Sequence, residues 1–279
     1  MEEFSFSVPQ NIVAGRKTIE KLPEIAAKLG GKKAFIISGP HLNKIGAVAA
    51  CEALLKKAGI ESAAFTDCEG NPSVETVEKA TAMFQKSGAD FIVAYGGGSP
   101  MDVAKAVGVV AKYGGSITDY EGAHKVPGDI IPLIAIPTTA GTGSEVTAFS
   151  VITDHSRQYK LTVFSYKILP AYAILDADLI TTVPAGVAAA CGMDALIHAL
   201  EAYISTAASP FSDAMAEKAM ELIGGHIRRY VANRGDLEAA QAMLVGSLFA
   251  GIAFSFARLG NVHAMSHPVS AHFNVAHGV

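Results

Sequence analysis

Short apolar runs alternate with amphipathic segments over the first part of the chain. The apolar runs are too short for helices and rich in branched or aromatic residues, so they predict buried strands at 33–37, 62–65, 90–95 and 131–136. Segments with apolar residues at helical spacing lie between these runs and predict helices at 15–29, 46–58, 74–87 and 101–113. Residues 4–13 alternate and contain Pro9, which is typical of an edge strand. Buried strands that alternate with helices predict a parallel α/β sheet.

From about Pro184 onward, the strand-like runs disappear. Long alanine-rich apolar patterns replace them and predict helices at 185–203, 210–230 and 237–256. The change of pattern predicts two domains with a boundary between 180 and 184. We therefore expect an α/β domain at residues 1–182 and an all-helical domain at residues 183–279.

Composition excludes several classes of protein. The chain has 279 residues, of which 50% are hydrophobic and 17% charged, as in a globular protein. Its net charge of -4 argues against nucleic acid as a partner. The three cysteines are widely spaced and suggest neither a disulfide framework nor a CxxC metal site, which suits a reducing cytoplasm. We expect no signal peptide and no membrane partner, because no uninterrupted apolar run approaches the ~20 residues of a membrane span.

Two loops follow predicted strands and carry glycines and hydroxyls. Gly96-Gly97-Gly98-Ser99 precedes a helix, where backbone N–H groups and the helix N-terminus favour a phosphate. An ordinary tight turn explains this loop equally well. The second loop, 138–144, falls at the same carboxyl edge of the sheet, where open α/β sheets bind ligands. Together the two loops predict a nucleotide site; Asp102, early in the following helix, is equally explained as a favourable helix-start charge.

Histidines and one acid form a second pattern. Asp194 and His198 are four apart, His263 and His267 repeat this spacing, and His277 follows ten residues later. Residues four apart share one face of a helix. Imidazole and carboxylate together suit iron or zinc. A single pair of this kind is more often a cap, a salt bridge or a buried histidine. The two pairs together with His277 make a metal site an equally good explanation, and spacing alone does not choose the ligands.

Four motifs resemble those of the iron-containing (group III) alcohol dehydrogenases. They are GGGSPMD at 96–102, PTTAGTGSEVT at 137–147, GMDALIH at 192–198, and GNVHAMSHP at 260–268 with HGV at 277–279. The resemblance implies the dehydroquinate synthase-like superfamily fold, with a dinucleotide-binding α/β domain, an all-helical domain and an active site between them. It also implies NAD(P)-dependent interconversion of small alcohols and aldehydes or ketones, with a divalent metal as Lewis acid.

The resemblance also assigns roles to residues. It implies the metal ligands Asp194, His198, His263 and His277. His267 falls beside the nicotinamide and substrate, where it is a candidate for relaying the alcohol proton; a structural histidine is the alternative. Phe254 falls near the substrate. The implied cofactor contacts are Asn71, Gly97, Gly98, Ser99, Asp102, Thr138, Thr139, Thr142, Thr147, Lys160 and Leu179.

The sequence departs from the family pattern at four places. Gly39 stands where NAD-preferring relatives often have an aspartate, so we expect NADP to be tolerated beside NAD. Phe256 replaces a common asparagine, and Ser270 and His272 interrupt a glycine-rich segment. The chain ends at Val279, where family members continue with further helices. We therefore expect a C-terminally truncated form that relies on contacts in a homodimer or higher oligomer.

Two alternatives to an iron-containing alcohol dehydrogenase stay open. One is a lyase resembling dehydroquinate synthase, which uses NAD only transiently. The other is a truncated form that binds nucleotide or metal without turnover.

Overall fold

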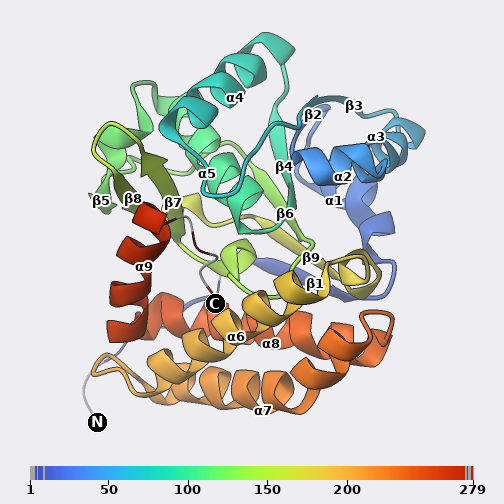
Figure 1. The fold of residues 1–279 in the computed structure, drawn as a ribbon. Helices are drawn as coiled ribbons and strands as arrows, with labels where there is room; N and C mark the ends of the chain where they lie inside the picture. The colour runs from blue at the N-terminus through green and yellow to red at the C-terminus, as the bar shows by residue number, and fades with distance from the viewer. Residues whose placement is uncertain (1–3, 5, 9, 274, 276–277, 279) are drawn as a thin grey trace.

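The computed structural model describes the whole chain except residues 1–3, 5, 9, 274, 276–277 and 279. Figure 1 shows an α/β layer above a helical layer, with α9 (Asn261–Phe273) standing beside both. Six parallel strands form the main sheet in the order β1-β9-β6-β4-β2-β3. They are β1 (Asn11–Gly15), β2 (Lys33–Ile37), β3 (Glu61–Phe65), β4 (Phe91–Gly96), β6 (Leu133–Pro137) and β9 (Tyr172–Asp176). The parallel α/β sheet predicted from the sequence is confirmed.

Alternate residues of the central strands enter different cores. In β2, Phe35 and Ile37 pack with α4 (Val74–Ser87) and α5 (Gly98–Tyr113). Ala34 and Ile36 pack on the other face with the helices α1 (Leu22–Lys28) and α3 (Ala47–Lys57). Successive side chains of a strand point to opposite faces, so both faces of this sheet are covered. The shorter helices of this layer are α1 (Leu22–Lys28), α2 (Pro40–Lys44) and α3 (Ala47–Lys57).

A small three-stranded sheet was not predicted. It has the order β5-β8-β7, with β7 (Phe149–Asp154) antiparallel to β8 (Tyr159–Phe164) and β5 (Gly122–Ala123) parallel to β8. Ile152 and Leu161 anchor the hairpin in the core beside α5. The hairpin forms one wall of the pocket described below.

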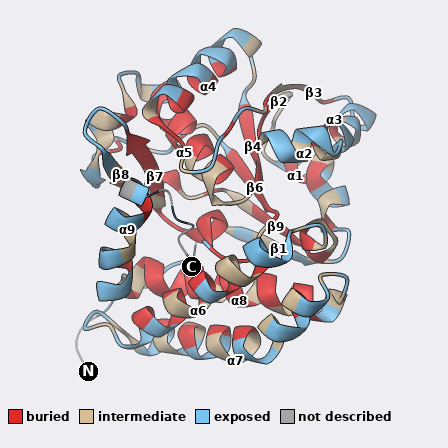
Figure 2. Cartoon of the chain, in the orientation of Figure 1, coloured by how far each residue is buried: buried red, intermediate tan, exposed pale blue. Residues whose placement is uncertain are grey.

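The helical layer follows the predicted pattern closely. It contains α6 (Ala185–Tyr203), α7 (Pro210–Ala232), α8 (Leu237–Ala257) and α9 (Asn261–Phe273). The first three pack on one another, and α8 is the most buried of them (Figure 2). By length and composition, α6 and α8 could each cross a membrane, but 72% of the apolar window of α8 is buried inside the protein. This degree of burial is that of a core helix.

Some boundaries predicted from the sequence are wrong. The helix expected at 15–29 begins only at Leu22, because a strand ends at Gly15 and Lys17 has a left-handed backbone with φ 54°. The edge strand expected at 4–13 corresponds to β1. It does lie at the edge of the sheet, but it begins at Asn11 and ends at Gly15, later in the chain than expected. The helix expected at 101–113 begins earlier, at Gly98.

Candidate active site

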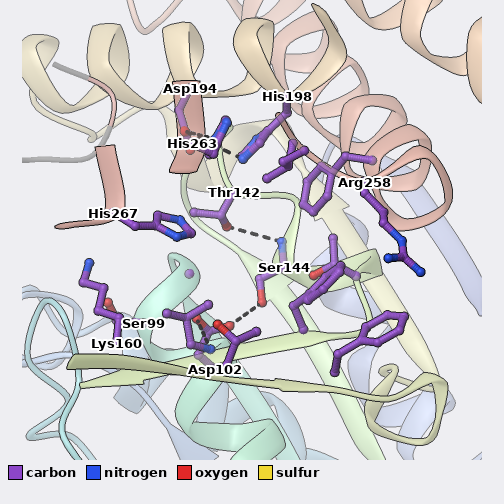
Figure 3. A pocket seen from close by; sticks show the side chains of 18 of the residues that line it. Ser99, Asp102, Thr142, Ser144, Lys160, Asp194, His198, Arg258, His263 and His267 are labelled. Carbon is purple, nitrogen blue, oxygen red and sulfur yellow. Dashed lines mark hydrogen bonds and ion pairs between the residues drawn. The ribbon is translucent and has the colours of Figure 1, made fainter. Parts of the chain in front are cut away.

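One cavity of about 650 Å³ lies between the α/β layer, the small sheet and the helical layer. The glycine loop and Asp102 border it from α5, while Asp194 and His198 border it from α6. α9 contacts β8 and brings His263 and His267 to the same cavity. Figure 3 shows these groups around one open space. The glycine-containing loops and the group of histidines with Asp194, which lie far apart in the sequence, therefore meet at one site.

Asp194, His198 and His263 form a buried cluster. One donor atom from each lies within 4.8 Å of the others. The Oδ1 atom of Asp194 is 3.8 Å from Nε2 of His198 and 3.4 Å from Nε2 of His263. Burial opposes protonation of His263, but Asp194 and Glu201 outweigh it and raise the pKa of His263. Two imidazoles and a carboxylate held this closely are a donor set that fits a divalent first-row metal.

His277 and His267 are the other two histidines of the predicted site, and the structure describes only the second. His277, the expected fourth ligand, lies outside the described residues. His267 is on α9 one turn beyond His263; their ring centroids are 6.1 Å apart. It borders the cavity but is not part of the buried cluster. Its role as proton relay stays a prediction.

Glu201 is a buried residue of this site that the sequence analysis missed. It lies seven residues after Asp194 on α6, and its Oε2 atom is 2.5 Å from Nδ1 of His263. Its Oε1 atom accepts the backbone N–H of Val262 at 2.7 Å, in the first turn of α9. A Cβ at Gly260 would come within 2.9 Å of Oε1, so glycine leaves room for the carboxylate. Glu201 thus ties the start of α9 to α6 and turns Nε2 of His263 toward Asp194. The spacing of Asp194, His198 and Glu201 on one helical face was the available signal.

Replacing Glu201 with glutamine is expected to weaken binding of a divalent metal by about 10- to 100-fold, as is typical for partners of metal-binding histidines. The amide keeps the shape of the side chain but removes the charge that orients His263. Titration of the metal-free protein with Co²⁺, followed by visible absorption, measures this. Glu221→Gln is the control, because that glutamate is exposed on α7 and pairs with Lys218. Equal affinities in the two variants would contradict the role of Glu201.

The two glycine-containing loops pack against each other. A Cβ at Gly98 would lie 2.8 Å from Cγ2 of Thr142, and one at Gly97 would lie 3.1 Å from Oγ1 of Thr139. Gly97 is the N-cap of α5 and Gly98 its first residue, so the helix start faces the second loop. Glycine is needed here because the loops approach too closely for a side chain. Such a helix start is suited to a phosphate group.

Seven of the eleven implied cofactor contacts line the cavity, whereas the other four, and Gly39, do not. Those that line it are Asn71, Gly98, Ser99, Asp102, Thr142, Thr147 and Lys160. Those outside its lining are Gly39, Gly97, Thr138, Thr139 and Leu179. Nζ of Lys160 donates to Oδ1 of Asn71 at 2.8 Å and to Oγ of Ser270 at 3.0 Å. This lysine therefore links the α/β layer to α9 across the cavity.

Lys105 is a fully buried cation beneath the cavity. Its Nζ donates to Oγ of Ser144 at 2.9 Å and to the backbone oxygens of Thr147 and Phe149 at 2.9 and 2.7 Å. Asp102 accepts from Oγ of Ser144 at 2.9 Å. Burial lowers the pKa of Lys105 to about 8, although Asp102 opposes the shift, and burial raises the pKa of Asp102. This network holds the second glycine-containing loop and β7 against α5.

An aromatic wall begins beside the buried cluster. The ring centroid of Phe254 is 4.5 Å from that of His198 and 6.0 Å from that of Phe149. Phe254 lines the cavity as expected, and its contact with substrate stays a prediction. Phe256, by contrast, does not line the cavity and packs against Phe6 and Tyr166.

Comparison with known proteins identifies the class of enzyme. A family model described as "Iron-containing alcohol dehydrogenase" matches residues 9–177, and one described as "Fe-containing alcohol dehydrogenase family, C-terminal" matches residues 188–279. The chain is 40% identical to NAD-dependent methanol dehydrogenase of Bacillus methanolicus, over 99% of this chain and 72% of that relative.

Solved structures agree with this result. A 1,3-propanediol oxidoreductase is 40% identical with a TM-score of 0.96, over 99% of this chain and 72% of that one. Sulfoacetaldehyde reductase of Bifidobacterium kashiwanohense, solved with NAD+, is 33% identical with a TM-score of 0.95, over 100% and 74%. These relatives are dehydrogenases and reductases, so the chain is an oxidoreductase and not a lyase. The chain belongs to the iron-containing alcohol dehydrogenase family.

Proposed function

We propose that this protein interconverts small alcohols and aldehydes or ketones, with NAD(P) bound along the glycine loop. A divalent metal would bind at Asp194, His198 and His263, with His277 as fourth ligand; iron is our choice and zinc the alternative. One observation carries the proposal: the buried donor cluster and the glycine loop open onto the same cavity. We also propose that the chain consists of a cofactor domain, 1–182, and a metal domain, 183–279.

The metal would supply Lewis acidity toward the alcohol oxygen, and the nicotinamide would carry the hydride. The residues of the chain orient these groups and the substrate. Lys160 and Asn71 border the cofactor side of the cavity, and His267 stands between that side and the cluster (Figure 3). His267 is our choice for passing the alcohol proton to solvent, because an unperturbed imidazole titrates near neutrality. Phe254 would exclude water beside His198.

Membership of the family does not identify the substrate, because the relatives compared above are named for three different ones: methanol, 1,3-propanediol and sulfoacetaldehyde. Protein purified without oxygen and loaded with Fe²⁺ or Zn²⁺ should therefore be assayed with NADH and a panel of short aldehydes. We expect one NADH to be oxidised for each aldehyde reduced. Binding of NADH without net oxidation by any aldehyde would contradict the proposal and favour a binding form without turnover.

The oligomeric state and location are part of the proposal. We infer a homodimer or higher oligomer, supported by exposed apolar side chains on α6 and α9: Val187, Met193, Leu200, Val262, Met265, Val269 and Phe273. We also infer a cytoplasmic location, supported by three free cysteines, two of them buried.

We expect NADPH to be used with a kcat/KM within about tenfold of that for NADH, because Gly39 offers no charge to repel a 2′-phosphate. Gly39→Asp should then reduce use of NADPH by a further factor of about 10 to 100, from a repulsion of order 1–3 kcal/mol. Gly39 is extended, with φ -95° and ψ 163°, so its backbone accepts aspartate. A Cβ there would lie 3.2 Å from the backbone oxygen of Cys68, a tight contact that a small shift relieves.

Kinetics with both cofactors measure this, and Gly186→Asp is the control. That substitution adds the same charge in the first turn of α6, where a Cβ meets nothing within 4 Å. If the unmodified enzyme rejects NADPH by about a thousandfold, roughly 4 kcal/mol, Gly39 does not set cofactor choice.

A further inference from the structure

Arg258 has an unusual backbone conformation at the edge of the cavity. It follows the last residue of α8 with φ 67° and ψ -178°, a combination found almost only in glycine. Its backbone N–H closes the helix by donating to the oxygen of Phe254 at 2.7 Å, which glycine would do as well. The described residues include five non-glycine residues with positive φ, and three of them line this cavity: Asn71, His124 and Arg258. Strained residues of this kind concentrate at functional sites, which indicates a functional role for the side chain of Arg258.

The side chain of Arg258 is available to a ligand. It makes no hydrogen bond or ion pair with any residue that the structure describes. In Figure 3 it lies across the cavity from His267 and Lys160, with its guanidinium directed away from His198. The two carboxylates that line the cavity, Asp102 and Asp194, are held by other groups. Among the residues that the structure describes, Arg258 is therefore a cation bordering the cavity without a paired carboxylate.

Aromatic side chains form a wall of the cavity that begins beside the buried cluster. Ring centroids follow one another from His198 to Phe254 at 4.5 Å, to Phe149 at 6.0 Å, to Phe164 at 4.7 Å and to His124 at 4.9 Å. His124 and Arg258 both line the cavity. A ligand whose oxygen lies at the cluster would therefore have aromatic carbon beside it, in the same cavity that Arg258 borders.

We propose that Arg258 binds a carboxylate on the substrate, so that the enzyme acts on short aldehydes that carry an acid group and on the corresponding hydroxy acids. The guanidinium presents a planar fork of N–H donors that matches a carboxylate. In the reductive direction, aldehyde, NADH and one proton give alcohol and NAD+; hydride forms the new C–H bond and the carboxylate is unchanged. This inference rests on the oxidoreductase function proposed above.

The test compares two aldehydes that differ in charge. The metal-loaded enzyme is assayed with 4-oxobutanoate and with butanal, in which a methyl group replaces the carboxylate. We expect the ratio of kcat/KM for 4-oxobutanoate to that for butanal to fall by roughly 10- to 100-fold in Arg258→Met, the value of a hydrogen bond to a charged group. Arg258→Lys should retain part of the ratio. Arg258→Gly should also lose the ratio while its melting temperature is at least that of the unmodified enzyme, because glycine relieves the backbone strain.

A second readout is independent of turnover. Butanoate binding to the metal-loaded enzyme with NAD+, measured by calorimetry, should weaken in Arg258→Met and Arg258→Gly by a similar factor. Butanal turnover with an unchanged ratio in these variants would overturn the carboxylate site alone. A raised KM for NADH with an unchanged ratio would assign Arg258 to the cofactor and would also overturn it. If neither aldehyde oxidises NADH, the proposed function fails and this inference fails with it.

Discussion

Replacing His263 with alanine is expected to remove most of the bound metal and to lower kcat/KM by at least about a thousandfold. His263 is 4% exposed, and its Nε2 atom lies 3.4 Å from Oδ1 of Asp194. A cluster that loses one of its donors holds metal poorly. Loss of Lewis acidity costs several kcal/mol of transition-state stabilisation, and each 1.36 kcal/mol is a factor of ten in rate.

Metal content by mass spectrometry and steady-state kinetics measure these effects together. His155→Ala is the control, because His155 is exposed in the turn between β7 and β8. Asp194→Asn provides a second test that keeps the size of the side chain, and thermal melting separates metal loss from unfolding. Chelation of the unmodified enzyme should reproduce the loss, and added Fe²⁺ or Zn²⁺ should restore it. Full metal content and rate in His263→Ala would contradict the ligand assignment.

The sequence predicted the main sheet and the helical layer because burial leaves a recognisable pattern of apolar residues in each. The residues of β2 and β4 are buried on both faces, so they appear as unbroken apolar runs. The long apolar helices α6, α7 and α8 have no competing strand signal. The hairpin of β7 and β8 was missed because neither strand contains an unbroken apolar run, and the alternation of buried and more exposed residues in β8 was the available signal. The helix start at Gly98 was hidden because glycine and proline predict a loop, whereas a close approach to Thr142 requires glycine there.

At the site, the sequence analysis predicted the residues that are regularly spaced along a helix. It missed the residues whose role depends on contacts with distant parts of the chain. Asp194 and His198 share one face of α6, which their spacing indicates. Glu201 lies on the same face but acts on His263, more than sixty residues later, and no local pattern points to that partner. Lys105 reads as an ordinary polar position within a helix, and only the fold places it under Ser144 and Thr147.

Replacing Lys105 with methionine is expected to reduce the free energy of unfolding by about 3–5 kcal/mol, the usual cost of removing one partner from a buried charged network. The backbone oxygens of Thr147 and Phe149 would lose a charged donor, and Asp102 would lose a neighbouring positive charge. Because these contacts hold the second loop against α5, the KM for NADH should also rise. Urea unfolding and kinetics measure the two effects. Lys112→Met is the control on the same helix, because Lys112 is exposed and donates only to the backbone oxygen of Asp129.

The pH dependence of this loss distinguishes a buried charge from simple packing. Burial lowers the pKa of Lys105 from 10.5 to about 8, so between these values the unfolded chain binds more protons than the folded one. The contribution of Lys105 to the free energy of unfolding therefore rises as pH increases through that window, by an amount on the order of 3 kcal/mol. Methionine does not titrate, so the difference in unfolding free energy between the unmodified protein and Lys105→Met should grow from pH 8 to pH 10. A difference that stays constant, or that matches Lys112→Met, would mean that Lys105 contributes through its carbon chain and not through its ammonium group.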